Sequence, residues 1–321
     1  MNLQTKIPLK PQTHNQIDYH ANVLLLGSCF VENIGQKLDY FKFRNLQNPF
    51  GILFHPLAID NLITNAVTKK VYKEEDVFFH NEQWHSFEVH SVLSNTSKAA
   101  LLDELNAQIQ LTREQIVAAS HIVITLGTAW VYRDIESETV VANCHKIPQK
   151  KFSKELLSVA NILKSLQASV QHIKSVNQSA DIIFTVSPIR HLKDGFIENT
   201  QSKAHLITAI HELLHEKSSH DNGKLYYFPS YEIMMDELRD YRFYADDMIH
   251  PNQTAIHYIW NAFKTVWISE SASKTMEAID EIQRGLQHKP FNSNSEAHLL
   301  FLKKLSEKKE KMETSFPHIT F

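Results

Sequence analysis

Three short, mostly apolar segments, Val23 to Leu26, His121 to Leu126 and Asp181 to Val186, recur along the chain with polar residues around them. Their branched and large apolar side chains occupy consecutive positions, which is typical of strands buried on both faces of a parallel sheet. Between such segments apolar residues recur at helical spacing, as they do after residue 30. This alternation predicts an α/β protein with a three-layer, doubly wound, mainly parallel sheet.

The same patterns predict the remaining elements and a division of the chain. We expect an N-terminal arm over residues 1–21, an α/β domain over residues 22–270, and a helical extension over residues 271–321 packed on that domain. Within the domain we expect strands at 41–45 and 225–228, a small antiparallel insertion at 77–90, a hairpin at 130–142, and helices at 56–67, 97–119, from 153 onward for about twenty residues, and 199–215.

Ser28 stands where the first apolar segment meets the following helix. Gly27 permits a tight turn at the carboxyl end of the strand, the end at which open α/β sheets bind their ligands. Two interpretations of Ser28 are open. Its hydroxyl faces the crevice beside backbone N–H groups that could hold an oxyanion, or it caps the helix, which is the more common use of serine at such a position.

A second informative stretch is Asp247-Met248-Ile249-His250, which Pro251 separates from the next helix. An aspartate three residues before a histidine in a loop can accept a hydrogen bond from the imidazole and fix its tautomer. If this loop follows the last strand, Asp247 and His250 meet Ser28 at the carboxyl edge of the sheet. Together the three residues would form a hydrolytic triad.

Gly27-Ser28-Cys29-Phe30 keeps the first four positions of a Gly-Ser-Cys-Phe-Ala motif, from which Val31 departs at the fifth. On this motif the chain resembles the GSCFA family, which is similar to a branch of the SGNH/GDSL hydrolase superfamily. The resemblance covers most of the chain and also includes Asn48-Pro49-Phe50-Gly51, Thr125-Leu126-Gly127, Asn143-Cys144-His145, Ser187-Pro188-Ile189-Arg190, Asp247-x-x-His250 and the charged C-terminal tail.

The resemblance implies a serine hydrolase that needs no cofactor. Ser28 is then the nucleophile, His250 the base and Asp247 its partner, and the expected reaction is hydrolysis or transfer of an acyl group, such as an O-acetyl ester of a carbohydrate. Cys29 is the less favoured nucleophile, because its side chain leaves the backbone in another direction. The expected substrate-binding residues are Asn48, His145 and Arg190.

The oxyanion hole departs from the superfamily pattern. The resemblance assigns its donors to the Ser28 and Gly51 N–H groups and to an asparagine in a Gly-x-Asn-Asp motif. That motif falls on Gly127-Thr128-Ala129-Trp130, which has no asparagine. Asn143 or the Thr128 hydroxyl is the candidate replacement. The missing asparagine also supports the competing hypothesis of a weak or inactive domain that binds acylated glycans.

Composition narrows the function classes. The chain has 321 residues and a net charge of -3, which gives no electrostatic reason to expect a nucleic-acid partner. Cys29 and Cys144 make neither a disulfide framework nor a zinc motif, and His85 and His90 lack a third metal ligand at a recognisable spacing. Without a signal-peptide core or a membrane-length apolar run, we expect a cytoplasmic protein that acts on small-molecule or carbohydrate esters, away from membranes.

Overall fold

The computed structural model describes residues 4–218 and 224–321, and it places a five-stranded parallel sheet at the centre of the chain. The spatial order is β10-β9-β5-β1-β2, so the chain winds outward in both directions from β1 and β5. The strands are β1 (Asn22–Gly27), β2 (Arg44–Gln47), β5 (His121–Leu126), β9 (Asp181–Val186) and β10 (Leu225–Phe228). This confirms the predicted doubly wound α/β class.

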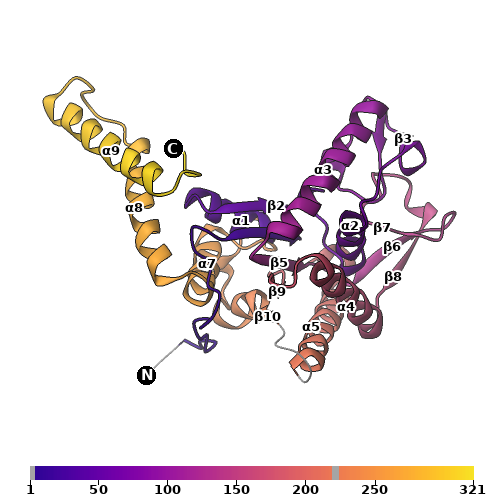
Figure 1. Ribbon diagram of the computed structural model, residues 1–321. Helices are drawn as coiled ribbons and strands as arrows, with labels where there is room; N and C mark the ends of the chain where they lie inside the picture. The colour runs from indigo at the N-terminus through magenta and orange to yellow at the C-terminus, as the bar shows by residue number, and fades with distance from the viewer. Residues whose placement is uncertain (1–3, 219–223) are drawn as a thin grey trace.

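Successive residues of each central strand face opposite sides of the sheet. Leu24 and Leu26 of β1 belong to one buried apolar cluster, and Val23 and Leu25 belong to the other. The first cluster is covered by α2 (Pro56–Thr68), α3 (Lys98–Ala118), α4 (Val159–Val176) and α5 (Phe196–Ser218), and the second by α1 (Phe30–Tyr40) and α7 (Gln253–Trp267) (Figure 1). The result is the predicted three layers.

The helix expected from Ser153 onward is wrong at its start. Residues Phe152–Leu156 form a strand, β8, which pairs antiparallel with β6 (Trp130–Asp134), and β6 also pairs with β7 (Val140–Val141). Arg133 and Glu155 form a cross-strand ion pair at 2.8 Å between Nε and Oε1. Helix α4 begins only after Ser158, whose hydroxyl accepts the N–H of Asn161 at 3.1 Å.

The other short elements agree more closely with the sequence pattern. The strand expected at 41–45 is displaced to Arg44–Gln47, because Lys42 takes a positive φ of 62° in the turn after α1. The predicted insertion is the hairpin β3 (Phe78–His80) and β4 (Gln83–His85). The remaining turns of helix are η1 (Glu74–Asp76), η2 (Ser91–Leu93), η3 (Gln149–Lys151), η4 (Leu192–Asp194), α6 (Ser230–Glu232), η5 (Ile233–Glu237) and η6 (Tyr241–Phe243).

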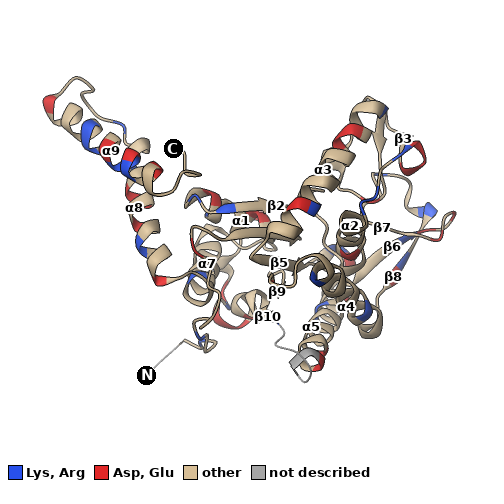
Figure 2. Ribbon diagram, in the orientation of Figure 1, with Lys and Arg blue, Asp and Glu red and all other residues tan. Residues whose placement is uncertain are grey.

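Both ends of the described chain lie against the α1 and α7 side of the domain. In the expected arm, residues 1–3 lie outside the described residues, and Ile17 forms a bridge with Ile268. Helices α8 (Glu270–Gln287) and α9 (Glu296–Ser315) form a hairpin that projects from the domain, with charged side chains along α9 (Figures 1 and 2). Met276 of α8 packs into the domain core. Within the described residues, no helix combines the length and apolarity that a bilayer crossing requires.

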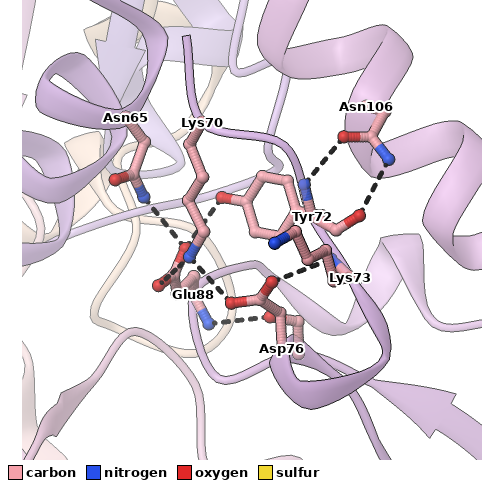
Figure 3. A network of polar contacts seen from close by, with 8 residues as sticks. Asn65, Lys70, Tyr72, Lys73, Asp76, Glu88 and Asn106 are labelled. Carbon is pink, nitrogen blue, oxygen red and sulfur yellow. Dashed lines mark hydrogen bonds and ion pairs between the residues drawn. The ribbon is translucent and has the colours of Figure 1, made fainter. Parts of the chain in front are cut away.

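A polar network beside α2 joins the loop after that helix to the segment after β4. Glu88 accepts hydrogen bonds from Lys70 Nζ at 2.8 Å, Tyr72 Oη at 2.8 Å and Asn65 Nδ2 at 3.0 Å (Figure 3). Lys70 also pairs with Asp76 at 3.0 Å. Because the network is partly buried, one carboxylate satisfies three donors that would otherwise lie against apolar surface.

Replacing Glu88 by Ala is expected to lower the free energy of unfolding by about 2 kcal/mol, because Tyr72 and Asn65 lose an acceptor and Lys70 keeps only Asp76. Urea denaturation measures the change. The exposed Glu307 of α9 offers a matched control, and Glu307→Ala should shift the unfolding free energy by less than about 0.5 kcal/mol. Equal effects of the two substitutions would show that the network contributes nothing specific.

Candidate functional site

Ser28 lies at the carboxyl end of β1, next to the point at which the sheet changes its winding direction. Strands β1 and β5 are neighbours there, and their carboxyl ends open the crevice in which such sheets bind ligands. The ladder between them continues past the last paired residues, since the Ser28 N–H donates to the Thr125 carbonyl at 3.0 Å. Ser28 therefore occupies the position that the sequence predicts for it.

Ser28 does not cap helix α1. The residue at the N-cap is Cys29, and no side chain there accepts a hydrogen bond from the helix. The Ser28 side chain is 1% exposed, and its Oγ is buried without a hydrogen-bond partner among the described residues. The capping interpretation is thus wrong. A buried hydroxyl without a partner costs about 1–3 kcal/mol of stability, so this one is not explained by folding.

Asp247 and His250 form a closely bonded pair in the loop before α7. Nδ1 of His250 lies 2.6 Å from Oδ2 of Asp247, while Oδ1 accepts the N–H groups of Ile249 and His250, each at 2.9 Å. These backbone N–H groups, together with the imidazole, lower the pKa of Asp247 to about 2. An ionised Asp247 keeps hydrogen on Nδ1 and leaves Nε2 of His250 free to accept a proton.

His191 follows β9 at the carboxyl ends of the strands. Burial lowers the pKa of His191 to about 3, and the charges of Lys203 and His250 act in the same direction, so the His250 imidazole lies within electrostatic range. At the other side of the ring, a Cβ atom placed on Gly127 would lie 3.1 Å from Nε2 of His191. The side chains of His250 and Asp247 are themselves about half exposed, at 50% and 46%. The Oγ of Ser28 makes no hydrogen bond to His250.

Lys203 is a buried residue of the site that the sequence analysis missed. It lies on α5, is 1% exposed, and donates to the carbonyls of Gly127 at 2.7 Å and Ser187 at 2.8 Å, which join the ends of β5 and β9. Burial lowers its pKa to about 7. A signal was present, because Lys203 shares a helical face with Leu206 and Ile210, both fully buried.

Three of the expected oxyanion donors make hydrogen bonds to other protein groups in the structure. The Ser28 N–H is bonded to Thr125, and the Gly51 N–H donates to the Asn48 carbonyl at 2.8 Å, closing a turn. The Thr128 hydroxyl lies 3.0 Å from Ser202 Oγ and accepts the N–H of Trp130 at 3.1 Å. Even the Gly127 N–H is occupied, by the Phe54 carbonyl at 2.7 Å.

The three residues expected to bind substrate lie in different surroundings. Asn48 lies beside Ser28, where its Oδ1 accepts the Gly27 N–H at 2.9 Å. Arg190 turns toward Met235, with Nη2 2.9 Å from the sulfur. His145 is 3% exposed, and its Nε2 lies 2.7 Å from the Ser86 carbonyl. His145 also lines the hollow described below.

A hollow of about 330 Å³ adjoins this edge of the sheet on the side of the β6-β7-β8 sheet. It combines aromatic rings with amides and a cation, and its lining includes Phe54, Trp130, Tyr132, Asn143, Gln149 and Lys193. Phe54 lines the hollow and also lies beside His191, with the centroids of the two rings 6.1 Å apart. Asn143 thus lines the neighbouring hollow, where its Oδ1 accepts the His145 N–H at 2.8 Å.

Both ring nitrogens of His85, in the antiparallel insertion, lie within hydrogen-bond distance of protein groups. Nδ1 of His85 lies 2.6 Å from Ser94 Oγ, and its Nε2 lies 2.9 Å from the His80 carbonyl. Among residues 4–218 and 224–321, no three His, Cys, Asp or Glu side chains are grouped closely enough to hold a metal ion.

The structure is an α/β domain with Ser28 and the buried Lys203 at the carboxyl ends of its strands and an Asp247–His250 pair in the loop before α7. The GSCFA family model matches residues 22–263, and the model of the GSCFA domain protein, C-terminal domain, matches residues 279–321. The first match covers most of the chain, so this chain belongs to the GSCFA family.

Further similarity to known proteins is remote. No curated protein matches the chain. Among solved structures, the chain is similar to an acetyl xylan esterase, Est2A, from the rumen bacterium Butyrivibrio proteoclasticus, with 10% sequence identity and a TM-score of 0.36. The match covers 88% of this chain and 66% of that protein, so the chain spans slightly less than two thirds of its length.

Proposed function

We propose that this protein is a serine hydrolase that cleaves, or transfers the acyl group of, an ester of a carbohydrate or another small alcohol. Two observations support the proposal: Asp247 and His250 form a pair bonded at 2.6 Å, and the Ser28 hydroxyl at the carboxyl end of β1 lies unpaired. Nucleophilic catalysis by serine requires a hydroxyl that is not used in folding and an oriented imidazole that can take its proton.

The reaction begins when Nε2 of His250 takes the proton of Ser28 as Oγ attacks the ester carbonyl carbon. The tetrahedral intermediate collapses with release of the alcohol, to which His250 returns the proton, and an acyl-Ser28 ester remains. Water, or a sugar hydroxyl in the case of transfer, then attacks this ester with His250 again acting as base. Asp247 stays ionised throughout and holds the imidazole in place, because its pKa is about 2.

Two neighbouring features fit this proposal. Burial raises the pKa of the Cys29 thiol, which disfavours the thiolate that a cysteine nucleophile needs and leaves Ser28 as the nucleophile. The hollow lined by Trp130 and Tyr132 offers flat apolar faces with amide groups beside them, which suit the ring and hydroxyls of a sugar. We assign the alcohol part of the ester to that hollow.

The closed state of Ser28 favours one competing function, binding of an acylated glycan without cleavage. Ser28 is 1% exposed and makes no hydrogen bond to His250. Catalytic hydrogen bonds are often absent before substrate binds, so a hydrolase must form this contact in its complex. A glycan-binding domain would never form it, and the two functions therefore differ in the reactivity of Ser28.

A fluorophosphonate probe tests this reactivity directly, because it phosphonylates serines that an adjacent base has activated. We expect covalent labelling of the wild-type chain, located at Ser28 by peptide mass spectrometry, and loss of labelling in His250→Ala. Cys29→Ala is the control and should be labelled as the wild type is. Labelling and hydrolysis of short-chain acyl esters should both persist in the presence of EDTA or phenanthroline. A folded wild-type chain that neither reacts with the probe nor hydrolyses acetylated sugars would overturn the proposal.

A further inference from the structure

A serine hydrolase needs donors for the negative charge that develops on the carbonyl oxygen, and removal of one such donor typically costs about 10²–10³ in rate. Here the N–H groups of Ser28, Gly51 and Gly127 are all bonded to backbone carbonyls. The source of the oxyanion donors is therefore open, and the inference below rests on the proposed function. Buried side-chain N–H groups without a partner are the place to look, because each costs stability unless a ligand uses it.

Asn48 supplies the first such group, from the β2 side of Ser28. Its Oδ1 is bonded to the N–H of Gly27 at 2.9 Å, which fixes the carboxamide beside the residue that precedes the nucleophile. Its Nδ2 is buried and has no hydrogen-bond partner among the described residues. The backbone of Asn48 is equally constrained, since its N–H donates to the Leu25 carbonyl at 2.9 Å and its own carbonyl accepts the Gly51 N–H.

His191 supplies the second group, from the β9 side. Its Nε2 is buried without a partner and lies at the end of β5, the strand next to Ser28. The backbone N–H of His191 donates to Oδ1 of Asn199 at 2.9 Å, which holds the residue in this position. Its pKa is lowered to about 3 by burial, with Lys203 and His250 as the groups whose charges act on it. A neutral imidazole with hydrogen on Nε2 donates without adding charge to the site.

We infer that Nδ2 of Asn48 and Nε2 of His191 form the oxyanion hole of this enzyme, in place of the asparagine that the Gly-x-Asn-Asp position lacks. Asn48 follows β2, one neighbour of β1, and Nε2 of His191 lies against Gly127 at the end of β5, the other neighbour of β1. As the bond from Ser28 Oγ to the carbonyl carbon forms, the carbonyl oxygen gains negative charge and accepts both N–H groups. When the double bond returns and the alcohol leaves, the two hydrogen bonds weaken again.

Two isosteric substitutions test the inference. Asn48→Asp keeps the acceptor for Gly27 and replaces the free donor by a second acceptor, and His191→Phe keeps a ring and removes the donor. Each is expected to lower kcat for acyl-ester hydrolysis by about 10²-fold or more with little change in KM. His191→Gln, whose amide nitrogen reaches the position of Nε2, should recover part of the loss. Asn161→Asp changes an exposed asparagine of α4 and serves as the matched control, with unchanged kcat.

A second measurement separates a donor from a residue that merely supports the fold. A trifluoromethyl ketone forms a tetrahedral adduct with the nucleophilic serine, and oxyanion donors lower the pKa of the adduct hydroxyl, which NMR reports. We expect that pKa to rise by about two units in His191→Phe, equivalent to the 10²-fold loss of rate. The pH at which hydrolysis falls on the acid side should stay unchanged, because a neutral ring was removed.

The outcomes distinguish this inference from the proposed function. An active wild type whose Asn48→Asp and His191→Phe variants are folded and keep kcat overturns the oxyanion assignment and leaves the serine hydrolase standing. If a variant loses both kcat and its native circular dichroism, its kcat says nothing about the oxyanion hole. The test is then the adduct pKa of the folded His191 variants, Phe compared with Gln. Equal pKa values in that pair would overturn the role of His191, whereas an inactive wild type rejects the proposed function itself.

Discussion

Replacing Ser28 by Ala is expected to lower the turnover of acyl esters by at least about 10⁴-fold, because the proposed mechanism forms the acyl-enzyme on Ser28. The same substitution should leave the free energy of unfolding unchanged or raise it by about 1 kcal/mol, because the hydroxyl it removes is buried without a partner. Initial rates with p-nitrophenyl acetate and urea denaturation of the same preparations measure the two effects.

The combination of lost activity with retained or increased stability is what identifies a group kept for chemistry. Cys29→Ala is the neighbouring control and should retain turnover. Wild-type rates in Ser28→Ala would assign the chemistry to another nucleophile. A loss of several kcal/mol would instead show that the hydroxyl stabilises the fold through a contact.

Replacing Gly27 by Ala is expected to destabilise the protein by more than about 4 kcal/mol, enough to prevent accumulation of the folded chain. Gly27 has a φ of +136°, which residues with a side chain rarely adopt, and a Cβ atom there would overlap the carbonyl oxygen of Thr125. That oxygen belongs to the backbone of a central strand, so no side-chain rotation relieves the overlap. Soluble yield and thermal unfolding by circular dichroism measure the effect.

Gly285 of α8 provides the matched control. A Cβ atom at Gly285 would meet the end of the Leu305 side chain, with Cδ1 at 2.7 Å, and a leucine side chain can rotate away. Alanine also favours a helix interior over glycine by about 0.5–1 kcal/mol. Gly285→Ala should therefore change the melting temperature by only a few degrees. If Gly27→Ala did no more than this, the turn before Ser28 would tolerate a side chain.

The elements that could be predicted from the sequence are those whose stability is local or strongly patterned. Strands β1, β5 and β9 are mostly apolar, and Pro56 marks the start of α2. Strand β8 could not be predicted in this way. Its residues alternate weakly, and it is a strand because β6, some twenty residues earlier in the chain, offers it an antiparallel partner.

The contacts of the candidate site likewise fall into local ones, which the sequence predicts, and long-range ones, which it does not. The contact between Asp247 and His250 spans three residues, so a loop of that spacing can form it without help from the rest of the chain. The oxyanion donors depend on distant groups. The Gly51 N–H is consumed by a turn, and the unpaired Nδ2 of Asn48 becomes visible only when the partner of its Oδ1 is known. Lys203 required knowledge of which face of α5 is buried.

Because Ser28 is 1% exposed, acylation in the proposed reaction must be preceded by an opening of the crevice. The observed kcat/KM is then the intrinsic value multiplied by the fraction of molecules that are open, and each 1.4 kcal/mol of opening cost lowers it about tenfold. A small ester contributes little binding energy toward that opening, so most protein molecules stay closed in its presence. An ester whose alcohol part fills the neighbouring hollow can shift the population, and selectivity for the larger substrate then arises before any bond to Ser28 forms.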